Sequence, residues 1–148
     1  MDSYREIKAL ILAYALCIDK GDFEGIGELF SKGKIIGNED NEAIHIVGSE
    51  AICAMYTATT RRYAGGTPCT HHVTTNIDIE VDGDTARATS YFTVFQAVED
   101  FPLQPIITGR YHDTFALQTH TWWFESRRME ITLVGDVSHH LLIDLEEI

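Results

Sequence analysis

The sequence predicts an α+β fold, in which three N-terminal helices pack inside a curved antiparallel sheet to form a cone-shaped barrel with one open mouth. Two observations carry this prediction. Apolar residues recur at helical spacing up to about residue 63, and from residue 70 onward they alternate with a period of two. With 148 residues, 45% of them hydrophobic and 23% charged, the chain is expected to form a single domain over residues 1–148.

Three helices are predicted in the first half of the chain. The first covers residues 4–18 and includes the apolar run 9–18. The second covers residues 23–30 and follows Asp22, a residue type that favours the N-cap position. The third begins at the cap residue Ser49 and is expected to run to Tyr63.

A short hairpin, residues 34–36 and 43–47, is predicted between the second and third helices. Four long strands of a meander follow, over residues 70–82, 86–94, 106–117 and 122–134. The dipeptide Asp82-Gly83 predicts a tight turn between the first two of these strands. The two prolines at positions 102 and 105 are expected to break the chain before the third.

The charge balance limits the partners. The chain has 23 Asp and Glu residues against 11 Lys and Arg, a net charge of -12, which disfavours binding to nucleic acid or to an anionic membrane. The apolar run 9–18 is too short to cross a bilayer and lacks the basic flank of a signal sequence. Three cysteines without a CxxC pair are typical of a reduced protein, so a cytoplasmic location is expected.

Asp19 is the first candidate functional residue. It continues the apolar stripe Leu12, Ala15, Leu16 at helical spacing, and it lies near a helix C-terminus, where the backbone dipole disfavours a negative charge. A residue that breaks two local rules is a candidate for function. The structural alternative is that Asp19 belongs to an ordinary turn, 19–22, and pairs with a nearby cation.

The pair His71-His72 opens the first long strand and supplies a candidate base. Strict alternation places His71 with the apolar residues Val73 and Ile77, and His72 on the opposite face. A bulge near 74–75 would exchange the two faces, and bulges often lie beside active sites. The structural alternative for either residue is a histidine at a strand end that forms local hydrogen bonds.

Several segments occur together in an order typical of one family. The chain resembles the SnoaL-like branch of the nuclear transport factor 2 superfamily from about residue 3 to residue 135. The resemblance rests on the segments 14–22, 29–30, 70–76 (THHVTTN), 81–86 (VDGDTA) and 109–113 (GRYHD). It implies the cone-shaped fold predicted above.

The superfamily includes scytalone dehydratase, hexachlorocyclohexane dehydrochlorinase, bile acid 7α-dehydratase, steroid isomerase, polyketide cyclases and β subunits of ring-hydroxylating dioxygenases. Its lyases use a His–Asp dyad without a metal, and the resemblance places this dyad on Asp19 and His72. A tyrosine of the bile acid enzyme falls on Tyr14. Because five residues rotate an ideal helix by about 140° away from the starting face, Tyr14 and Asp19 converge only if the helix end unwinds.

Four further residues are candidate substrate contacts. His71 is the alternative to His72 as the histidine that faces the pocket. The Tyr56 hydroxyl is a candidate donor for an enolate oxygen. Arg110 stands in a largely uncharged strand, where it either binds an anionic substrate group or pairs with a nearby carboxylate. Trp122 is expected at a pocket wall, with the core as the alternative.

No metal or other cofactor is expected, because the sequence lacks HxH and HExxH spacing, a glycine-rich phosphate loop and a nucleophile elbow. The prediction is a cofactor-independent lyase or isomerase of dehydratase type that acts on a small cyclic, carbonyl-bearing molecule. The expected partners are a hydrophobic or cyclic ligand and further copies of the chain, as a dimer or trimer. The alternatives are a non-catalytic binding or assembly subunit, like a dioxygenase β subunit, and a polyketide cyclase.

Overall fold

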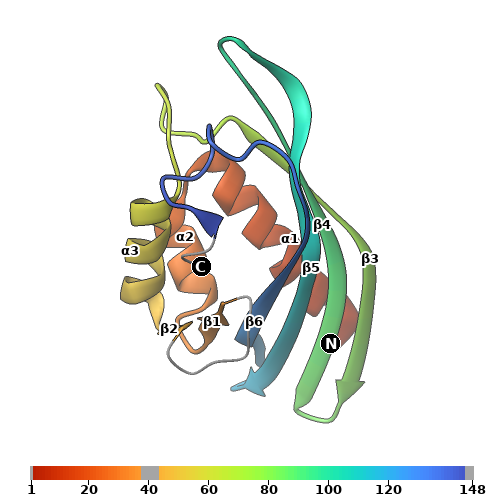
Figure 1. Ribbon diagram of the computed structural model, residues 1–148. Helices are drawn as coiled ribbons and strands as arrows, with labels where there is room; N and C mark the ends of the chain where they lie inside the picture. The colour runs from red at the N-terminus through yellow and green to blue at the C-terminus, as the bar shows by residue number, and fades with distance from the viewer. Residues whose placement is uncertain (1, 38–43, 146–148) are drawn as a thin grey trace.

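The structure, a computed structural model, describes residues 2–37 and 44–145. In these residues three helices lie against one face of a curved six-stranded sheet (Figure 1). The helices are α1 (Ser3–Lys20), α2 (Phe23–Leu29) and α3 (Ser49–Thr59). The predicted α+β cone is therefore confirmed, and α1 lies across the concave side of the sheet (Figure 1).

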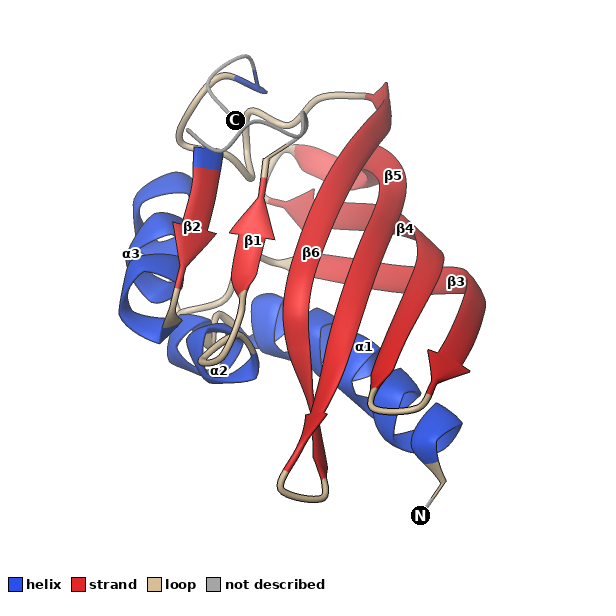
Figure 2. Cartoon of the chain, turned by 90° about the horizontal axis from the view of Figure 1, so that it is seen from below, coloured by secondary structure: helices blue, strands red, loops and turns tan. Residues whose placement is uncertain are grey.

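The strands are β1 (Lys34–Ile36), β2 (His45–Val47), β3 (Thr70–Asp82), β4 (Thr85–Val98), β5 (Phe101–Gln118) and β6 (Thr121–Val134). Their order across the sheet is β2-β1-β6-β5-β4-β3 (Figure 2). The four long strands form the predicted antiparallel meander. However, β1 pairs with β6 in the parallel direction, so the sheet is mixed and not wholly antiparallel as predicted.

The buried stripe of α1 differs from the one that the sequence suggested. Leu12 and Leu16 are 40% and 60% exposed, whereas the stripe that the helix buries is offset by one residue toward the N-terminus. That stripe consists of Ile7, Ile11, Tyr14 and Ile18. Asp19 thus flanks the apolar stripe and does not interrupt it. Gly21 ends the helix with a positive φ of 73°, and a Cβ there would collide with the carbonyl oxygen of Gly66.

The third helix is shorter than predicted at its C-terminal end. It begins at Ser49, but the cap position belongs to Gly48, with a φ of 86°, and no side chain caps it. It ends at Thr59 because Thr60 adopts an extended conformation and forms a β-bridge with Leu141. The chain after β6 therefore returns to the end of α3.

The two prolines do not break the sheet as expected. Strand β5 begins at Phe101 and includes Pro102 and Pro105, so the β4–β5 hairpin extends well beyond the other strands (Figure 1). Because β6 pairs with β5 only from Ile107 onward, residues 101–105 have a neighbouring strand on one side alone. A proline, which lacks an N–H group, is tolerated at such a free edge.

A bulge in β3 decides which histidine faces inward. Thr75 pairs with Tyr91 and Asp78 pairs with Thr89, so that two residues of β3 oppose one residue of β4. One of the two, Asn76, has a φ of 53°. The bulge reverses the alternation: His72 lies on the inner face with Ile79, and His71 lies outside and exposed. The bulge is close to the position that the sequence suggested.

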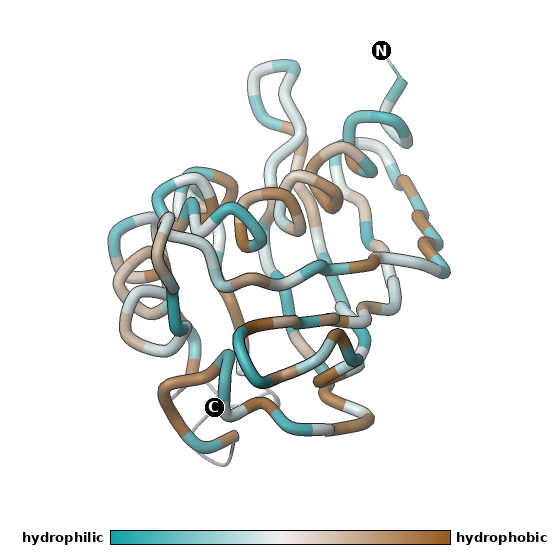
Figure 3. The backbone as a smooth tube through the Cα atoms, turned by 90° about the horizontal axis from the view of Figure 1, so that it is seen from above, coloured by the Kyte–Doolittle hydropathy of each residue, from teal (hydrophilic) through white to brown (hydrophobic). Residues whose placement is uncertain are grey.

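The core fills the space between the helices and the concave face. At its centre Phe30 stacks on Phe124 at 4.5 Å, and Phe124 contacts Phe115 at 4.8 Å, measured between ring centroids. All three side chains are at most 1% exposed. Apolar and polar residues alternate along the chain, as expected of elements that bury one face (Figure 3).

Candidate active site

A hydrogen-bonded carboxylate and imidazole join the end of α1 to the beginning of β3. Oδ1 of Asp19 lies 2.6 Å from Nδ1 of His72 and 2.8 Å from the hydroxyl of Thr70, which donates to it. Oδ2 of Asp19 accepts the backbone N–H of His72 at 2.8 Å. The carboxylate therefore holds the His72 ring and the backbone that carries this ring.

The electrostatics of the pair define the state of the imidazole. Partial burial alone would raise the pKa of Asp19, but the hydrogen bonds and charge of His72 and the hydroxyl of Thr70 outweigh it and hold this pKa below its ordinary value. Asp19 is thus ionised at neutral pH and can only accept hydrogen bonds. The proton of a neutral His72 ring then lies on Nδ1, which leaves the lone pair of Nε2 free to act as a base.

His72 lines an apolar cavity of about 320 Å³ between the sheet, α1, α3 and the chain that follows β6. The His72 side chain is only 5% exposed, and Asp19 lies behind it, outside the cavity lining. Most of the wall is hydrocarbon or thioether, contributed by residues such as Ile18, Ile46, Met55, Phe92, Ile107 and Met129. This combination of an apolar wall and a few polar groups is typical of small-molecule sites.

Two tyrosine hydroxyls supply further polar atoms to the cavity. The hydroxyl oxygens of Tyr14 and Tyr56 lie 2.6 Å apart, and both residues line the cavity. Burial raises the pKa of each hydroxyl above its ordinary value, so both are neutral at pH 7. Since one hydroxyl donates to the other, the second keeps its own proton for a ligand.

Helix α1 stays helical as far as Lys20, so its end does not unwind. Tyr14 and Asp19 therefore point in different directions, and the site does not require their side chains to meet. Tyr14 lies one turn before Ile18 and faces the cavity with it, whereas Asp19, the next residue, reaches the His72 ring from the side. The imidazole, held by Asp19, faces the same cavity as the Tyr14 hydroxyl. The angular difficulty predicted for an ideal helix is thereby removed.

A buried ion pair supports the tyrosines from behind. Nε and Nη2 of Arg127 donate to the two carboxylate oxygens of Asp113 at 2.8 and 2.9 Å, and both side chains are fully buried. The guanidinium carbon lies 3.7 Å from the ring centroid of Tyr111 and 4.4 Å from that of Tyr14. This pair was not predicted from the sequence, although Asp113 alternates with Tyr111 and Phe115 on one strand face, which marks it as inward-facing.

His140 is a further cavity residue that was not predicted from the sequence. This residue lines the cavity, and its ring centroid lies 6.3 Å from that of His72. It belongs to the chain after β6, where neither helical nor alternating periodicity reveals which side chains point inward. The sequence therefore carries no signal that would have placed it beside His72.

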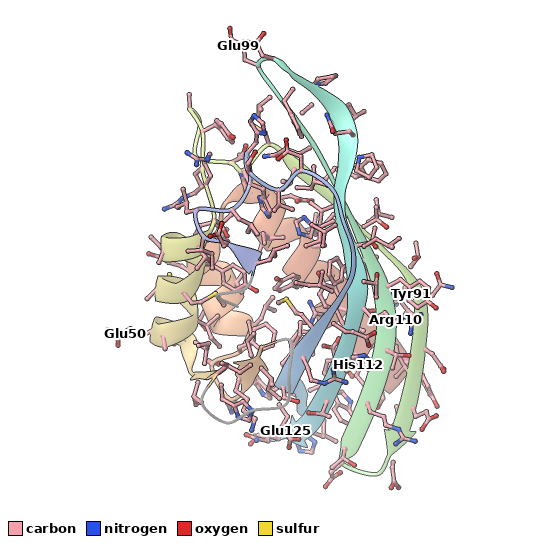
Figure 4. The ribbon with its side chains drawn as sticks, viewed as in Figure 1. Glu50, Tyr91, Glu99, Arg110, His112 and Glu125 are labelled. Atoms are coloured by element: carbon pink, nitrogen blue, oxygen red, sulfur yellow. The ribbon has the colours of Figure 1, made fainter. Side chains whose placement is uncertain are left out.

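Three predicted substrate contacts lie away from the cavity. Arg110 is on the outer face of the sheet, where its guanidinium carbon lies 5.0 Å from the centroid of the Tyr91 ring (Figure 4). Trp122 is 2% exposed, and its indole N–H donates to the Ser3 hydroxyl at 3.1 Å, which corresponds to the core alternative. His71 is exposed on the outer face because of the bulge. Of the predicted residues, the structure brings together Asp19, His72, Tyr14 and Tyr56.

A second hollow, of about 300 Å³, is lined by polar and charged side chains of the outer sheet face, including Arg87 and His112. These two are already paired, Arg87 with Glu80 and His112 with Glu130, both at 2.8 Å. Among the residues that the structure describes, no three His, Cys, Asp or Glu side chains are grouped to hold a metal ion. None of the described helices is long and apolar enough to span a membrane.

Comparison with known proteins agrees with this architecture. A single-residue variant of Rv3472, a protein of unknown function from Mycobacterium tuberculosis, superposes with a TM-score of 0.71 at 24% identity over 91% of this chain and 79% of its own. A provisionally named scytalone dehydratase from Novosphingobium aromaticivorans gives 0.68 at 20% identity over 90% and 86%. The β subunit of a provisionally named aromatic-ring-hydroxylating dioxygenase from the same organism gives 0.66 at 23% identity over 94% and 95%.

At these identities the solved structures show a shared fold and nothing finer. No curated protein matches the sequence significantly. The family of SnoaL-like domains, in contrast, matches residues 1–128, which include the three helices and both members of the Asp19–His72 pair. The chain therefore belongs to the SnoaL-like domain family.

Proposed function

We propose that this protein is a cofactor-independent lyase or isomerase of dehydratase type, which removes a proton from the carbon beside a carbonyl group of a small cyclic molecule. One observation carries the proposal: the imidazole of His72, held by Asp19 at 2.6 Å, opens onto an apolar cavity that also holds two tyrosine hydroxyls. A base and hydrogen-bond donors for an enolate oxygen thus share one cavity.

The reaction follows from the order of these groups. Nε2 of His72 takes the proton from carbon, and the electron pair of the C–H bond moves toward the carbonyl oxygen, which accepts a hydrogen bond from the Tyr14–Tyr56 pair. Asp19 stabilises the imidazolium that forms. In a dehydration the bond from the β carbon to its hydroxyl oxygen then breaks, and the departing hydroxide takes the proton from His72 and leaves as water. In an isomerisation the proton returns to a different carbon.

The charge of the cavity favours a neutral substrate. The described residues that line it include no Asp, Glu, Lys or Arg. The nearby charge of Arg127 is balanced by its bidentate bond to Asp113. A charged ligand would therefore lose its hydration without gaining an ionic partner. The volume of about 320 Å³ suits a molecule of one or two rings.

Membership of the SnoaL-like family and the structural similarity to a provisionally named scytalone dehydratase support this proposal. The similarity to a dioxygenase β subunit favours a second candidate, a non-catalytic assembly subunit. The two differ in what they require of the site, because only the enzyme depends on the protonation chemistry of His72. A polyketide cyclase that uses the same cavity is a variant of the first candidate.

The proposal is tested by proton exchange in α-tetralone, a neutral bicyclic ketone. The protein is incubated with this ketone in D₂O, and NMR follows the loss of the signal from the hydrogens beside the carbonyl. We expect the wild type to accelerate the exchange and His72→Ala to lose about 10²–10⁴-fold of that acceleration. His71→Ala is the matched control, because it removes the neighbouring imidazole on the outer face.

Dehydration is tested with β-hydroxy cyclohexanone, whose enone product is detected by ultraviolet absorption. If His72→Ala catalyses each of the two reactions as fast as the wild type does, the enzymatic proposal is wrong. Absence of both reactions, together with stable association with a larger oxygenase subunit, would establish the assembly candidate in its place.

A further inference from the structure

A second imidazole lies in the cavity wall beside the proposed base. The ring centroids of His72 and His140 are 6.3 Å apart, with the ring planes at 65° to each other. Both residues line the same cavity, and His140 is 5% exposed. The two rings therefore border the same space, and a ligand beside the His72 ring also lies close to His140.

The backbone around His140 is firmly held. Its carbonyl oxygen accepts the N–H of Arg61 at 2.8 Å, and the N–H of Leu142 donates to the carbonyl of Thr59 at 2.9 Å. One residue earlier, the carbonyl of His139 accepts the side-chain amide of Gln96 at 3.0 Å. These bonds tie residues 139–142 to the end of α3 and to β4, so the backbone that carries the His140 ring is held without a ligand.

The His140 ring, in contrast, has no polar partner among the described residues. Its buried Nδ1 forms no hydrogen bond, although an unpaired buried polar atom is normally costly. Burial and the neighbouring His72 lower the pKa of His140 to about 4, so its ring is neutral at pH 7. A neutral imidazole carries one N–H donor, and here that donor is available to a ligand oxygen.

We propose that His140 is a substrate-binding residue that donates a hydrogen bond to the leaving hydroxyl of a β-hydroxy ketone, next to the base His72. This inference rests on the proposed function and assigns its substrate class. The substrate is a neutral cyclic molecule with two oxygens, of which the carbonyl oxygen contacts the Tyr14–Tyr56 pair and the β-hydroxyl oxygen contacts His140.

The two histidines then have different tasks during elimination. The proton from carbon moves to Nε2 of His72, which becomes positively charged while Asp19 compensates the charge. The C–O bond breaks, the electron pair stays on oxygen, and that oxygen takes the proton from His72 and departs as water. His140 keeps its own proton throughout and only stabilises the charge that develops on the oxygen. A second positive charge beside the His72 imidazolium is thereby avoided.

Conservative replacements of His140 show which nitrogen of its ring donates the hydrogen bond. An asparagine amide at position 140 presents its N–H₂ near the place of Nδ1, whereas a glutamine amide presents it near the place of Nε2. Either amide is a neutral donor, as the imidazole is. A leucine has a similar size and offers no donor.

The test compares two reactions of each variant, exchange in α-tetralone and dehydration of β-hydroxy cyclohexanone. Exchange involves no leaving group, so His140→Leu should slow dehydration about 10- to 100-fold more than it slows exchange. His140→Gln or His140→Asn should restore most of the dehydration rate. His139→Gln is the matched control in the same segment, because the His139 ring stacks on Phe101 outside the cavity lining.

The outcomes separate this inference from the proposed function. If the wild type catalyses exchange but His140→Leu slows both reactions equally, or neither, the assignment of His140 is overturned and His72 remains the base. If the wild type catalyses neither reaction, the proposed function fails.

Binding alone still decides the role of His140 in that case. NMR titration of the His72→Ala protein gives the affinity ratio between β-hydroxy cyclohexanone and cyclohexanone. We expect His140→Leu in this background to reduce the advantage of the hydroxyl compound several-fold. An unchanged ratio contradicts the inference.

Discussion

Asp19 forms two hydrogen bonds with His72: one carboxylate oxygen lies 2.6 Å from the ring nitrogen Nδ1, and the other accepts the backbone N–H at 2.8 Å. A carboxylate that fixes both the ring and its backbone removes two freedoms of the imidazole, its tautomer and its orientation. Catalysis benefits when such freedoms are already lost before the substrate binds. Thr70, which donates to the same carboxylate, fixes the orientation of Asp19 in turn.

Replacing Asp19 tests this arrangement directly. In Asp19→Asn the amide can donate to Nδ1, which favours the tautomer with the proton on Nε2 and removes the free base. We expect the exchange rate of α-tetralone to fall about 10²–10⁴-fold. Asp22→Asn, three residues further on, caps α2 outside the cavity and should keep the wild-type rate. Full activity of Asp19→Asn would contradict the role of the pair.

The tyrosine pair should stabilise the enolate oxygen. Tyr14→Phe and Tyr56→Phe each leave one hydroxyl in place, so each should reduce exchange by about 10²–10³-fold, the typical effect of removing one donor from an oxyanion site. The loss of their mutual hydrogen bond should lower the free energy of unfolding by only about 1 kcal/mol. Urea unfolding measured beside the exchange assay separates the two effects. A rate loss that merely follows unfolding would argue against a donor role.

The buried histidine predicts a specific acid sensitivity. The pKa of His140 is lowered from 6.5 to about 4 by burial and by His72, so the unfolded chain binds a proton more readily than the folded chain. The contribution of the neutral His140 ring to the free energy of unfolding is therefore complete above about pH 6.5. As the pH falls toward 4, this contribution is lost, and the total loss is about 3 kcal/mol. Urea unfolding across this window should show a flatter pH dependence for His140→Gln than for the wild type. His139→Gln should retain the wild-type slope.

The ion pair behind the tyrosines predicts a large change in stability. Asp113→Ala leaves the fully buried guanidinium of Arg127 without its carboxylate and should reduce the free energy of unfolding by about 3–5 kcal/mol. Glu80→Ala is the contrasting control, because Glu80 and Arg87 are 59% and 75% exposed, and their loss should cost less than about 1 kcal/mol. Similar losses in both variants would show that burial of the first pair does not matter.

The bulge in β3 predicts a link between backbone conformation and the position of the base. Asn76 has a φ of 53°, which glycine adopts easily and a β-branched residue does not. Asn76→Gly should therefore be close to neutral, and Asn76→Val should destabilise the protein by about 1–2 kcal/mol. Because the bulge turns His72 inward, Asn76→Val should also slow the exchange reaction. Equal stability of both variants would show that the bulge does not require this conformation.

The sequence predicted the architecture well because the architecture depends on periodicity. The change from helical spacing to alternation near residue 70 predicted the α+β fold, and the turn Asp82-Gly83 predicted the first hairpin of the meander. The details that failed depend on neighbours in space. Pro102 and Pro105 lie within a strand because one edge of that strand is free, and the end of α3 is set by Leu141, which is distant in sequence.

The candidate site was only partly predictable for the same reason. Asp19 was suggested by its position in the helix and by the family resemblance, His72 and Tyr14 by the resemblance, and Tyr56 by the chemistry that the reaction needs. Arg110 lies outside the cavity because a charged residue in a strand faces outward unless it has a buried partner, and the buried carboxylate of the same strand, Asp113, pairs with Arg127. His140 could not be found, because a segment without regular structure gives no rule for side-chain direction.

The reactive pair and the cavity wall come from largely different elements, and this separation affects how the ligand range of such a protein can change. The base and its carboxylate come from the end of α1 and the start of β3, whereas much of the wall comes from β1, β2, α3, β5 and β6. Selection or design can thus exchange Met55, Ile107 or Met129 for larger or smaller residues and admit new ligands, while the reactive pair stays intact. One scaffold can in this way acquire many substrates without reinventing its chemistry.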